Sequence, residues 1–132
     1  MINASDFKVV IENPKGSYKS FEIENDPVWS SYPLKGMTYP VDYGYIEGYT
    51  GEDGAGLDLF VGSGHLAGYI RVWRLDVPTE TKFFANITDS ELEEIKKCFG
   101  PVLREVKLLN DMDFTKALEK FNNDQEKYAG KI

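Results

Sequence analysis

The chain has 132 residues, of which 42% are hydrophobic and 28% are charged, and its formal net charge is −7. This length predicts a single domain over residues 1–132 with a core of its own. The acidic balance argues against a nucleic-acid partner, because phosphate backbones are bound by concentrated basic surfaces. No apolar run approaches the roughly 20 residues of a membrane helix, and the single cysteine, Cys98, excludes an internal disulfide. The N-terminal residues lack the pattern of a secretion signal, so the sequence predicts a cytoplasmic protein without a membrane partner.

The first half of the chain is strand-like. Two segments, 7–12 and 18–24, flank the turn sequence Asn13-Pro14-Lys15-Gly16, and together they predict a β-hairpin. Further short strands are expected at 57–61, 68–75 and 82–85. Several short strands at this spacing favour a small barrel or sandwich.

Helices are expected only in the second half. Thr88 or Ser90 can cap a helix that Gly100-Pro101 ends, and residues 102–109 read as one more strand. A second helix is expected from Asp113, followed by a polar tail from about residue 122 that we expect to fray. The pattern therefore predicts an α+β fold, mainly β, with two flanking helices.

The segment between Tyr39 and Val61, YPVDYGYIEGYTGEDGAGLDLFV, concentrates tyrosines, glycines and carboxylates. Asp53 and Asp58 flank Gly54 and Gly56, so both carboxylates can face one point. Hard carboxylate oxygens on a glycine loop suit a Mg²⁺-like ion, and phenols beside them offer hydrogen bonds to an oxygen-rich ligand. We interpret this segment as the functional centre.

A second group of charged residues follows in the chain. Asp76 and Glu80 flank a proline-containing turn, and Lys82 comes two residues later at the start of an apolar strand. A barrel could bring this turn close to the glycine loop, where converging carboxylates would repel one another unless metal ions neutralised them. The alternative is that the acidic residues are solvated turn residues and that Lys82 extends its ammonium to water.

The run YPVDYGYI followed by EDGAGLD resembles the signature of the soluble (family I type) inorganic pyrophosphatases, of which this chain would be a short and divergent member. The resemblance covers roughly residues 8 to 100 and implies a small, twisted five-stranded OB-like barrel with helices outside. It implies hydrolysis of diphosphate to two orthophosphates, with Mg²⁺, or Mn²⁺ in its place, activating water and screening charge.

The resemblance also implies roles for individual residues. The metal ligands would be Asp53, Asp58, Asp76 and Glu80. The catalytic residues would be Tyr43, Lys82 and Glu12. The substrate, a small-molecule diphosphate, would be bound by Lys19, Tyr43 and Lys82.

The chain departs from the family pattern at several positions. Ala55 replaces the middle aspartate of the metal loop, Gly56 replaces a proline, and Asp42 replaces an asparagine. Ser31 stands where an arginine is expected, and the later tyrosine-lysine pair has no counterpart. Glu52 or Asp42 could supply the missing carboxylate if the loop is re-aimed. Two functions therefore remain open: a diphosphate hydrolase, or a catalytically weak or inactive relative that binds metal and phosphate or serves as an assembly module. Homo-oligomer formation also stays open.

Overall fold

The structure is a computed structural model that describes residues 7–21, 32–52, 56–75 and 79–129, with side chains up to residue 121. Its strands are β1 (Val9–Asn13), β2 (Tyr18–Ser20), β3 (Gly36–Thr38), β4 (Asp42–Thr50), β5 (Gly56–Val61), β6 (Leu66–Val72), β7 (Glu80–Ile87) and β8 (Leu103–Leu109). Its helices are α2 (Asp89–Cys98), a 3₁₀ turn at Gly100–Val102, and α3 (Asp111–Ala129). None of the described helices is long and apolar enough to cross a membrane.

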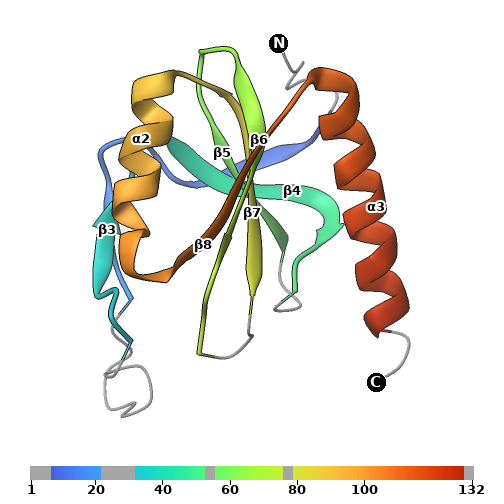
Figure 1. The fold of residues 1–132 in the computed structure, drawn as a ribbon, viewed down its shortest axis with the longest axis horizontal. Coiled ribbons are helices and arrows are strands. Elements are labelled where there is room, and N and C mark those ends of the chain that lie inside the picture. The colour runs from blue at the N-terminus through green and yellow to red at the C-terminus, as the bar shows by residue number, and fades with distance from the viewer. Residues whose placement is uncertain (1–6, 22–31, 53–55, 76–78, 130–132) are drawn as a thin grey trace.

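The centre of the fold is a six-stranded sheet in the order β1-β4-β5-β7-β6-β8, and β2 and β3 form a separate two-stranded sheet (Figure 1). The predicted α+β, mainly β class is confirmed. The main sheet has six strands rather than five, and in the described part of the chain no pairing joins β1 to β8. The structure is therefore an open, twisted sheet, and the barrel describes it only loosely.

The predicted hairpin is wrong, although its strands and its turn exist. Ser17 N donates to Pro14 O at 3.0 Å, as expected for a turn. The chain then pairs elsewhere, because Gly16 N donates to Tyr39 O and Tyr39 N donates to Ser17 O. As a result β1 pairs with β4, and β2 pairs with β3. This arrangement draws the two segments apart into different sheets.

Strand β7 lies inside the sheet, parallel to β5 and antiparallel to β6, and all of its residues are buried. Each face of the sheet packs against one helix (Figure 1). The α2 face buries, among others, Tyr43, Phe60, Ile70, Phe84 and Ile95. The α3 face buries, among others, Ile46, Leu57, Phe83, Phe114 and Leu118. Side chains on neighbouring positions of β7 therefore enter different cores.

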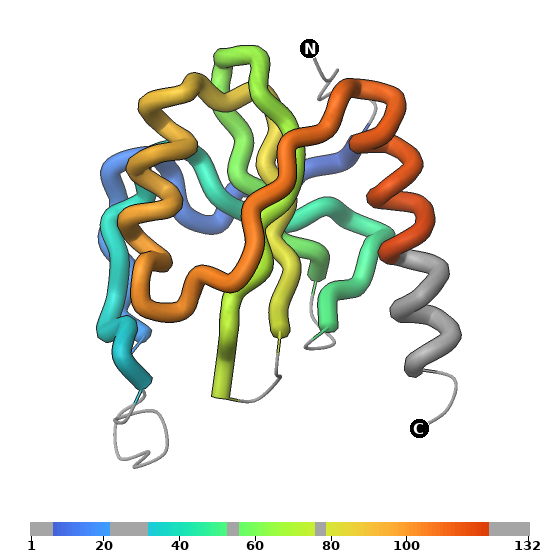
Figure 2. Tube along the Cα trace, in the orientation of Figure 1, coloured from blue at the N-terminus to red at the C-terminus, as the bar shows by residue number. Residues whose placement is uncertain are grey.

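The helix ends follow local hydrogen bonding. Of the two candidate caps for α2, Thr88 is the one used: its hydroxyl accepts from Glu91 N, and the Glu91 carboxylate accepts from Thr88 N. The chain then runs along the edge of the sheet as β8 and enters α3, on the other side from α2 (Figure 2). Helix α3 begins at Asp111, two residues before the predicted start, and continues to Ala129, beyond the predicted end of order near residue 122.

One glycine of the Tyr39–Val61 segment has a clear packing role. A Cβ on Gly44 would collide with the backbone of Val10 on β1. Glycine between Tyr43 and Tyr45 therefore lets β1 lie close against β4. This close approach holds the strand that carries Tyr43.

Candidate active site

Three successive residues at the start of β7 alternate between the two faces of the sheet. Glu80 and Lys82 share the parity of Phe84, which lies in the α2 core, whereas Thr81 shares the parity of Phe83 in the α3 core. All three are buried, with Glu80 3% and Lys82 8% exposed. Buried charges are costly unless they are paired, so partners are required.

The partners of Lys82 come from three neighbouring strands. Its ammonium donates to Tyr43 Oη on β4 at 2.7 Å, to Asp58 Oδ2 on β5 at 2.8 Å and to Glu80 Oε1 on β7 at 3.1 Å. A lysine ammonium has three hydrogens, so these contacts account for all of its donors. Strand order thus brings residues that are far apart in sequence to one point on the α2 face.

Arg74 is a member of this site that the sequence-based site prediction did not include. Its guanidinium Nη1 lies 2.6 Å from Glu80 Oε2, so Glu80 is held by two cations. The sequence did carry a signal, because Arg74 alternates with Ile70 and Val72, which are buried on the α2 face. A charge that continues an apolar face needs a buried partner.

Aromatic rings surround the Lys82 ammonium. Tyr39 stacks on Tyr43 with ring centroids 4.9 Å apart, and the Tyr43 ring packs against Phe60. The ammonium lies 5.2 Å from the Tyr43 ring centroid and 5.9 Å from that of Phe99. These rings exclude water on one side, which strengthens the charge pairing.

The environment separates the acidities of the two carboxyls that touch Lys82. Burial, together with the hydrogen bond to Glu80 and that residue's charge, raises the pKa of Asp58 to about 7, although Lys82 opposes the shift. Burial also acts to raise the pKa of Glu80, but Lys82, the hydrogen bond with Asp58 and Arg74 together lower it to about 2. Near neutral pH the metal-free pair of Asp58 and Glu80 therefore shares one proton part of the time.

The two groups that face these carboxyls keep their protons. Burial acts to lower the pKa of Lys82, but Asp58, Tyr43 and Glu80 outweigh it, and the pKa lies well above its usual value. Burial raises the pKa of Tyr43 well above its usual value, against the effect of Lys82. The site therefore offers an ammonium and a neutral phenol at physiological pH.

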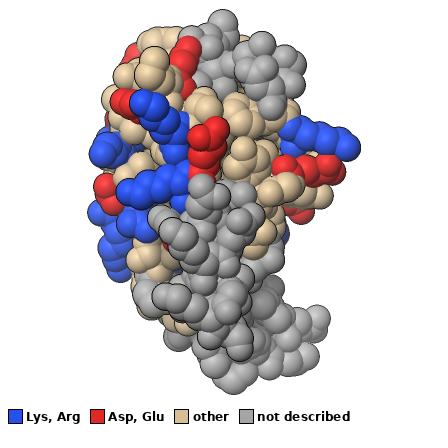
Figure 3. Space-filling view, turned by 90° about the vertical axis from the view of Figure 1, so that its right-hand side faces the viewer, with Lys and Arg blue, Asp and Glu red and all other residues tan. Residues whose placement is uncertain are grey.

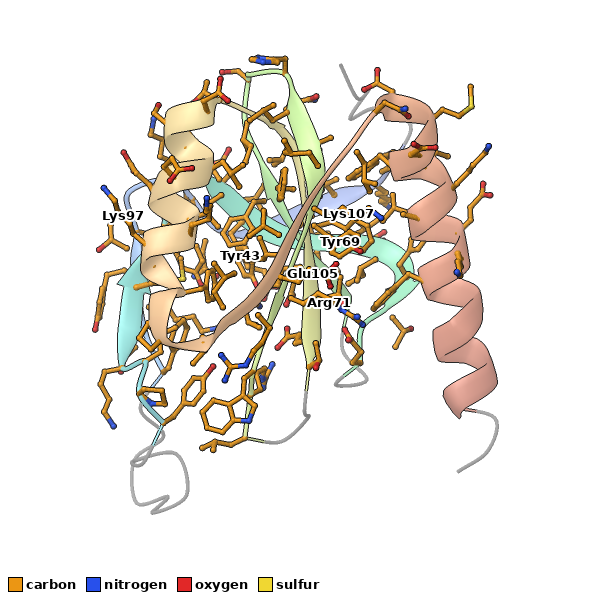
Figure 4. The ribbon with its side chains drawn as sticks, in the orientation of Figure 1. Tyr43, Tyr69, Arg71, Lys97, Glu105 and Lys107 are labelled. Carbon is orange, nitrogen blue, oxygen red and sulfur yellow. The ribbon has the colours of Figure 1, made fainter. Side chains whose placement is uncertain are left out.

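These groups form one wall of a cavity of about 430 Å³, a volume that suits a small ligand. In Figure 4, Tyr43 lies between α2 and the sheet. Six of the eight predicted site residues line the cavity: Glu12, Lys19, Tyr43, Asp58, Glu80 and Lys82. The other two, Asp53 and Asp76, lie outside the described residues, as do Ala55 and Ser31. The predicted site residues that the structure describes thus converge at one place.

The acidic and basic side chains that line the cavity are equal in number among the described residues. Three carboxylates and three cations line it, namely Glu12, Asp58 and Glu80 with Lys19, Arg74 and Lys82, so their formal charges cancel. Within the described ranges, no three acidic, histidine or cysteine side chains lie close enough to form a metal site. A metal site here would need Asp53 and Asp76, whose two negative charges would match a divalent ion.

The two residues considered as replacements for the carboxylate missing at Ala55 are both engaged elsewhere. Asp42 Oδ1 accepts a hydrogen bond from Lys15 N at 2.9 Å. Glu52 accepts from Thr81 N at 2.7 Å and from Thr81 Oγ1 at 3.2 Å. Neither residue lines the cavity. In this structure neither one supplies the missing group.

A family model and several curated proteins match parts of this chain. The family model for inorganic pyrophosphatase matches residues 1–86. Over 57 residues the chain is 42% identical to an inorganic pyrophosphatase of Corynebacterium glutamicum, a match that covers 41% of this chain and 36% of the relative. Inorganic pyrophosphatases of Streptomyces coelicolor and Leifsonia xyli are 39% and 40% identical over 59 and 58 residues, each match covering 42% of this chain and 36% of the relative.

The fold and the charged cavity define a mainly β protein with a site for a small polar ligand. Because the family model matches more than half of the chain, the chain belongs to the inorganic pyrophosphatase family. The matches span 36% of the length of these curated relatives, so they do not by themselves assign the activity of the full-length relatives to this chain.

Proposed function

We propose that this protein hydrolyses inorganic diphosphate to two orthophosphates with a divalent cation, Mg²⁺ or Mn²⁺. The observation that supports this most strongly is the junction of Tyr43, Asp58, Glu80 and Lys82 on the wall of a cavity that Glu12 and Lys19 also line. Cations and a phenol suit phosphate oxygens, and carboxylates suit the metal that a polyanionic substrate brings.

Each residue has a part in this proposal. Asp53, Asp58, Asp76 and Glu80 would hold the cation, which would act as a Lewis acid on phosphate oxygens and on the attacking water. The Tyr43 phenol would donate a hydrogen bond to the departing phosphate, the positive charge of Lys82 beside it would stabilise that phosphate, and Lys19 would bind the other end of the substrate. Glu12 would orient the attacking water. The water oxygen would bond to one phosphorus, the bridging P–O bond would break, and the two hydrogens of the water would end on the two orthophosphates, one on each.

Phosphate release tests the proposal directly. Purified protein is incubated with diphosphate and Mg²⁺, and separately with Mn²⁺, and orthophosphate is measured. Lys82→Met, assayed with the metal present and with its fold verified by circular dichroism, is the inactive control, because it removes the charge at the centre of the junction. Release that depends on the metal and is lost in the variant supports the proposal. No release at high protein concentration with either metal would contradict it.

A second candidate function is a non-catalytic module that binds metal and phosphate. Ala55 favours it, because the family loop has an aspartate there and neither Glu52 nor Asp42 replaces it in this structure. Calorimetric titration with Mn²⁺ and imidodiphosphate, a diphosphate analogue that resists hydrolysis, separates the two functions. Binding of the analogue without turnover of diphosphate would favour the module.

The remaining predictions concern partners and location. Lysine and arginine side chains gather along one side of the view in Figure 3, with aspartate and glutamate among them. Because the net charge is −7, we propose a protein without a nucleic-acid partner. We also propose a cytoplasmic location. Homo-oligomer formation remains a prediction that analytical ultracentrifugation would test.

A further inference from the structure

Strand β8 forms one edge of the main sheet. It is the last strand in the order β1-β4-β5-β7-β6-β8, so among the described strands it pairs with β6 alone. Figure 1 shows β8 at the front of the sheet, with α2 to one side of it and α3 to the other. A sheet edge of this kind presents backbone N–H and C=O groups to any strand that can pair with it. The outer edge of β8 is therefore a candidate interaction surface.

The side chains and the register of β8 favour such pairing. Four of its residues are exposed: Arg104, Glu105, Lys107 and Leu108. Leu108 is 56% exposed although its side chain is apolar. The pairing of β8 with β6 is regular from Glu105 to Leu109, whereas β1, at the opposite edge of the sheet, is regular only from Val9 to Ile11. Because an interrupted register hinders edge pairing, β8 is the better template of the two edges.

Two opposite charges of β8 lie on one face of the sheet. Glu105 is opposite Arg71 on β6, and Lys107 is opposite Tyr69, so Glu105 and Lys107 share a face. Figure 4 shows all four residues on the α3 side of β8. The Tyr69 hydroxyl donates to the Glu105 carboxylate at 3.4 Å. Val106 stands between the two charges and packs on the other face, against the α2 core.

These charges match a second copy of β8 in one register. When two identical strands pair in antiparallel, the two-fold axis must pass a residue rather than a peptide bond if side chains on the same face are to meet. An axis at Val106 places Glu105 opposite Lys107 of the second copy, and it does so twice. An axis at Glu105 or at Lys107 would place like charges directly opposite each other, which is destabilising. The axis at Val106 also overlaps the whole strand, Leu103–Leu109.

We propose that this protein forms a homodimer in which the outer edges of two β8 strands pair in antiparallel about a two-fold axis at Val106. The main sheets of the two copies then continue into each other through backbone hydrogen bonds, and two Glu105–Lys107 pairs fix the register. Leu108 comes to lie opposite Arg104 of the second copy, whose alkyl stem covers it. The dimer is independent of the proposed hydrolysis, because no residue of β8 lines the cavity.

Charge reversal tests the register. Lys107→Glu and Glu105→Lys each create two like-charge contacts across the axis, and each should weaken the dimer about tenfold in analytical ultracentrifugation. An equimolar mixture of these two variants regains both opposite-charge pairs and should form heterodimers about as tightly as the wild type dimerises. The double variant Glu105→Lys/Lys107→Glu should dimerise like the wild type for the same reason. Lys97→Glu is the matched control, because Lys97 is exposed on the side of α2 that faces away from β8 (Figure 4).

The wild type tests the location of the interface without any variant. Amide hydrogen exchange of residues 103–109 should slow as the protein concentration rises, because the outward N–H groups become paired, and this measurement stands even if a variant does not fold. A wild type that stays monomeric up to millimolar concentration would overturn the proposal, and the charges of β8 would then serve to protect the edge. Exchange at β8 that is independent of concentration would also overturn it, as would charge variants that dimerise no more weakly than Lys97→Glu.

Discussion

The Lys82 ammonium lies 2.7 Å from the Tyr43 hydroxyl and donates to it, although the two residues are 39 positions apart in the chain. A phenol that accepts from an ammonium keeps its own hydrogen for another acceptor. Because Tyr43 lines the cavity, that hydrogen can reach a ligand oxygen there. The pair therefore positions one neutral donor beside one cation, which is the arrangement that a departing phosphate requires.

Removing the Tyr43 hydroxyl should affect turnover more than folding. In Tyr43→Phe the ring that packs against Tyr39 and Phe60 remains, so the free energy of unfolding should fall by only about 1 kcal/mol. The rate of diphosphate hydrolysis should fall about 10- to 100-fold, because one donor to the departing phosphate is lost. Tyr69→Phe is the control, since Tyr69 lies outside the cavity and donates to Glu105 at 3.4 Å. Equal rate losses in both variants would refute a role for the Tyr43 hydroxyl.

Replacing Lys82 should destabilise the metal-free protein strongly. Lys82→Met leaves the buried carboxyls of Asp58 and Glu80 without the ammonium they share, and breaking a buried ion pair typically costs about 3 to 5 kcal/mol. Added Mg²⁺ should recover part of this loss, because a cation can take over the neutralisation. Denaturant unfolding with and without Mg²⁺ measures both effects. Lys8→Met, at a side chain that is 81% exposed, should change neither value, and a Lys82 variant as stable as that control would contradict the prediction.

Restoring the carboxylate that the family loop has at position 55 tests whether Ala55 limits hydrolysis. Ala55→Asp should raise diphosphate hydrolysis about 100-fold or more, because it returns a carboxylate where the family loop has one, and a factor of 100 corresponds to about 2.7 kcal/mol of barrier. Initial rates at saturating Mg²⁺ measure it. Ala55→Asn has a similar size without the charge and serves as the control. If both variants raise the hydrolysis rate equally, or if neither raises it, the missing carboxylate at Ala55 does not limit the rate.

Much of the fold could be predicted because its signals are local. The strands β5 to β8 were predicted from short apolar segments between turn residues, and the helix cap depends on Thr88 and Glu91, three positions apart. The prediction of a hairpin failed because strand pairing depends on residues that are distant in the sequence. Gly16 and Ser17 form backbone hydrogen bonds with Tyr39, and no local sequence pattern reveals this. The open six-stranded order depends on the parallel β5–β7 pairing, and this too is a long-range feature.

In the candidate site, too, the residue types could be predicted from local sequence, whereas the contacts between them could not. The residue types around Lys82 were evident from the Tyr39–Val61 segment and from the turn before β7. Their mutual contacts required the strand order, since Tyr43, Asp58 and Lys82 come from β4, β5 and β7. Glu52 was one of two candidates for replacing the carboxylate missing at Ala55, and only its hydrogen bonds to Thr81 show that it contacts the other face of β7.

Metal affinity should depend on pH through Asp58. Its pKa is raised from 3.8 to about 7, so between about pH 4 and about pH 7 the folded protein holds a proton there that the unfolded chain has lost. The contribution of this group to folding stability therefore falls as the pH rises through that window. A cation bound by the Asp58 carboxylate must displace that proton, so Mn²⁺ affinity should rise with pH, by up to about tenfold per unit, and level off above about pH 7. Calorimetry in two buffers of different ionisation enthalpy should show nearly one proton released at about pH 6 and almost none at about pH 8. Asp58→Asn cannot titrate and should bind weakly with no such step. Proton release that is zero at both pH values, or a step that persists in Asp58→Asn, would show that Asp58 is not the titrating ligand.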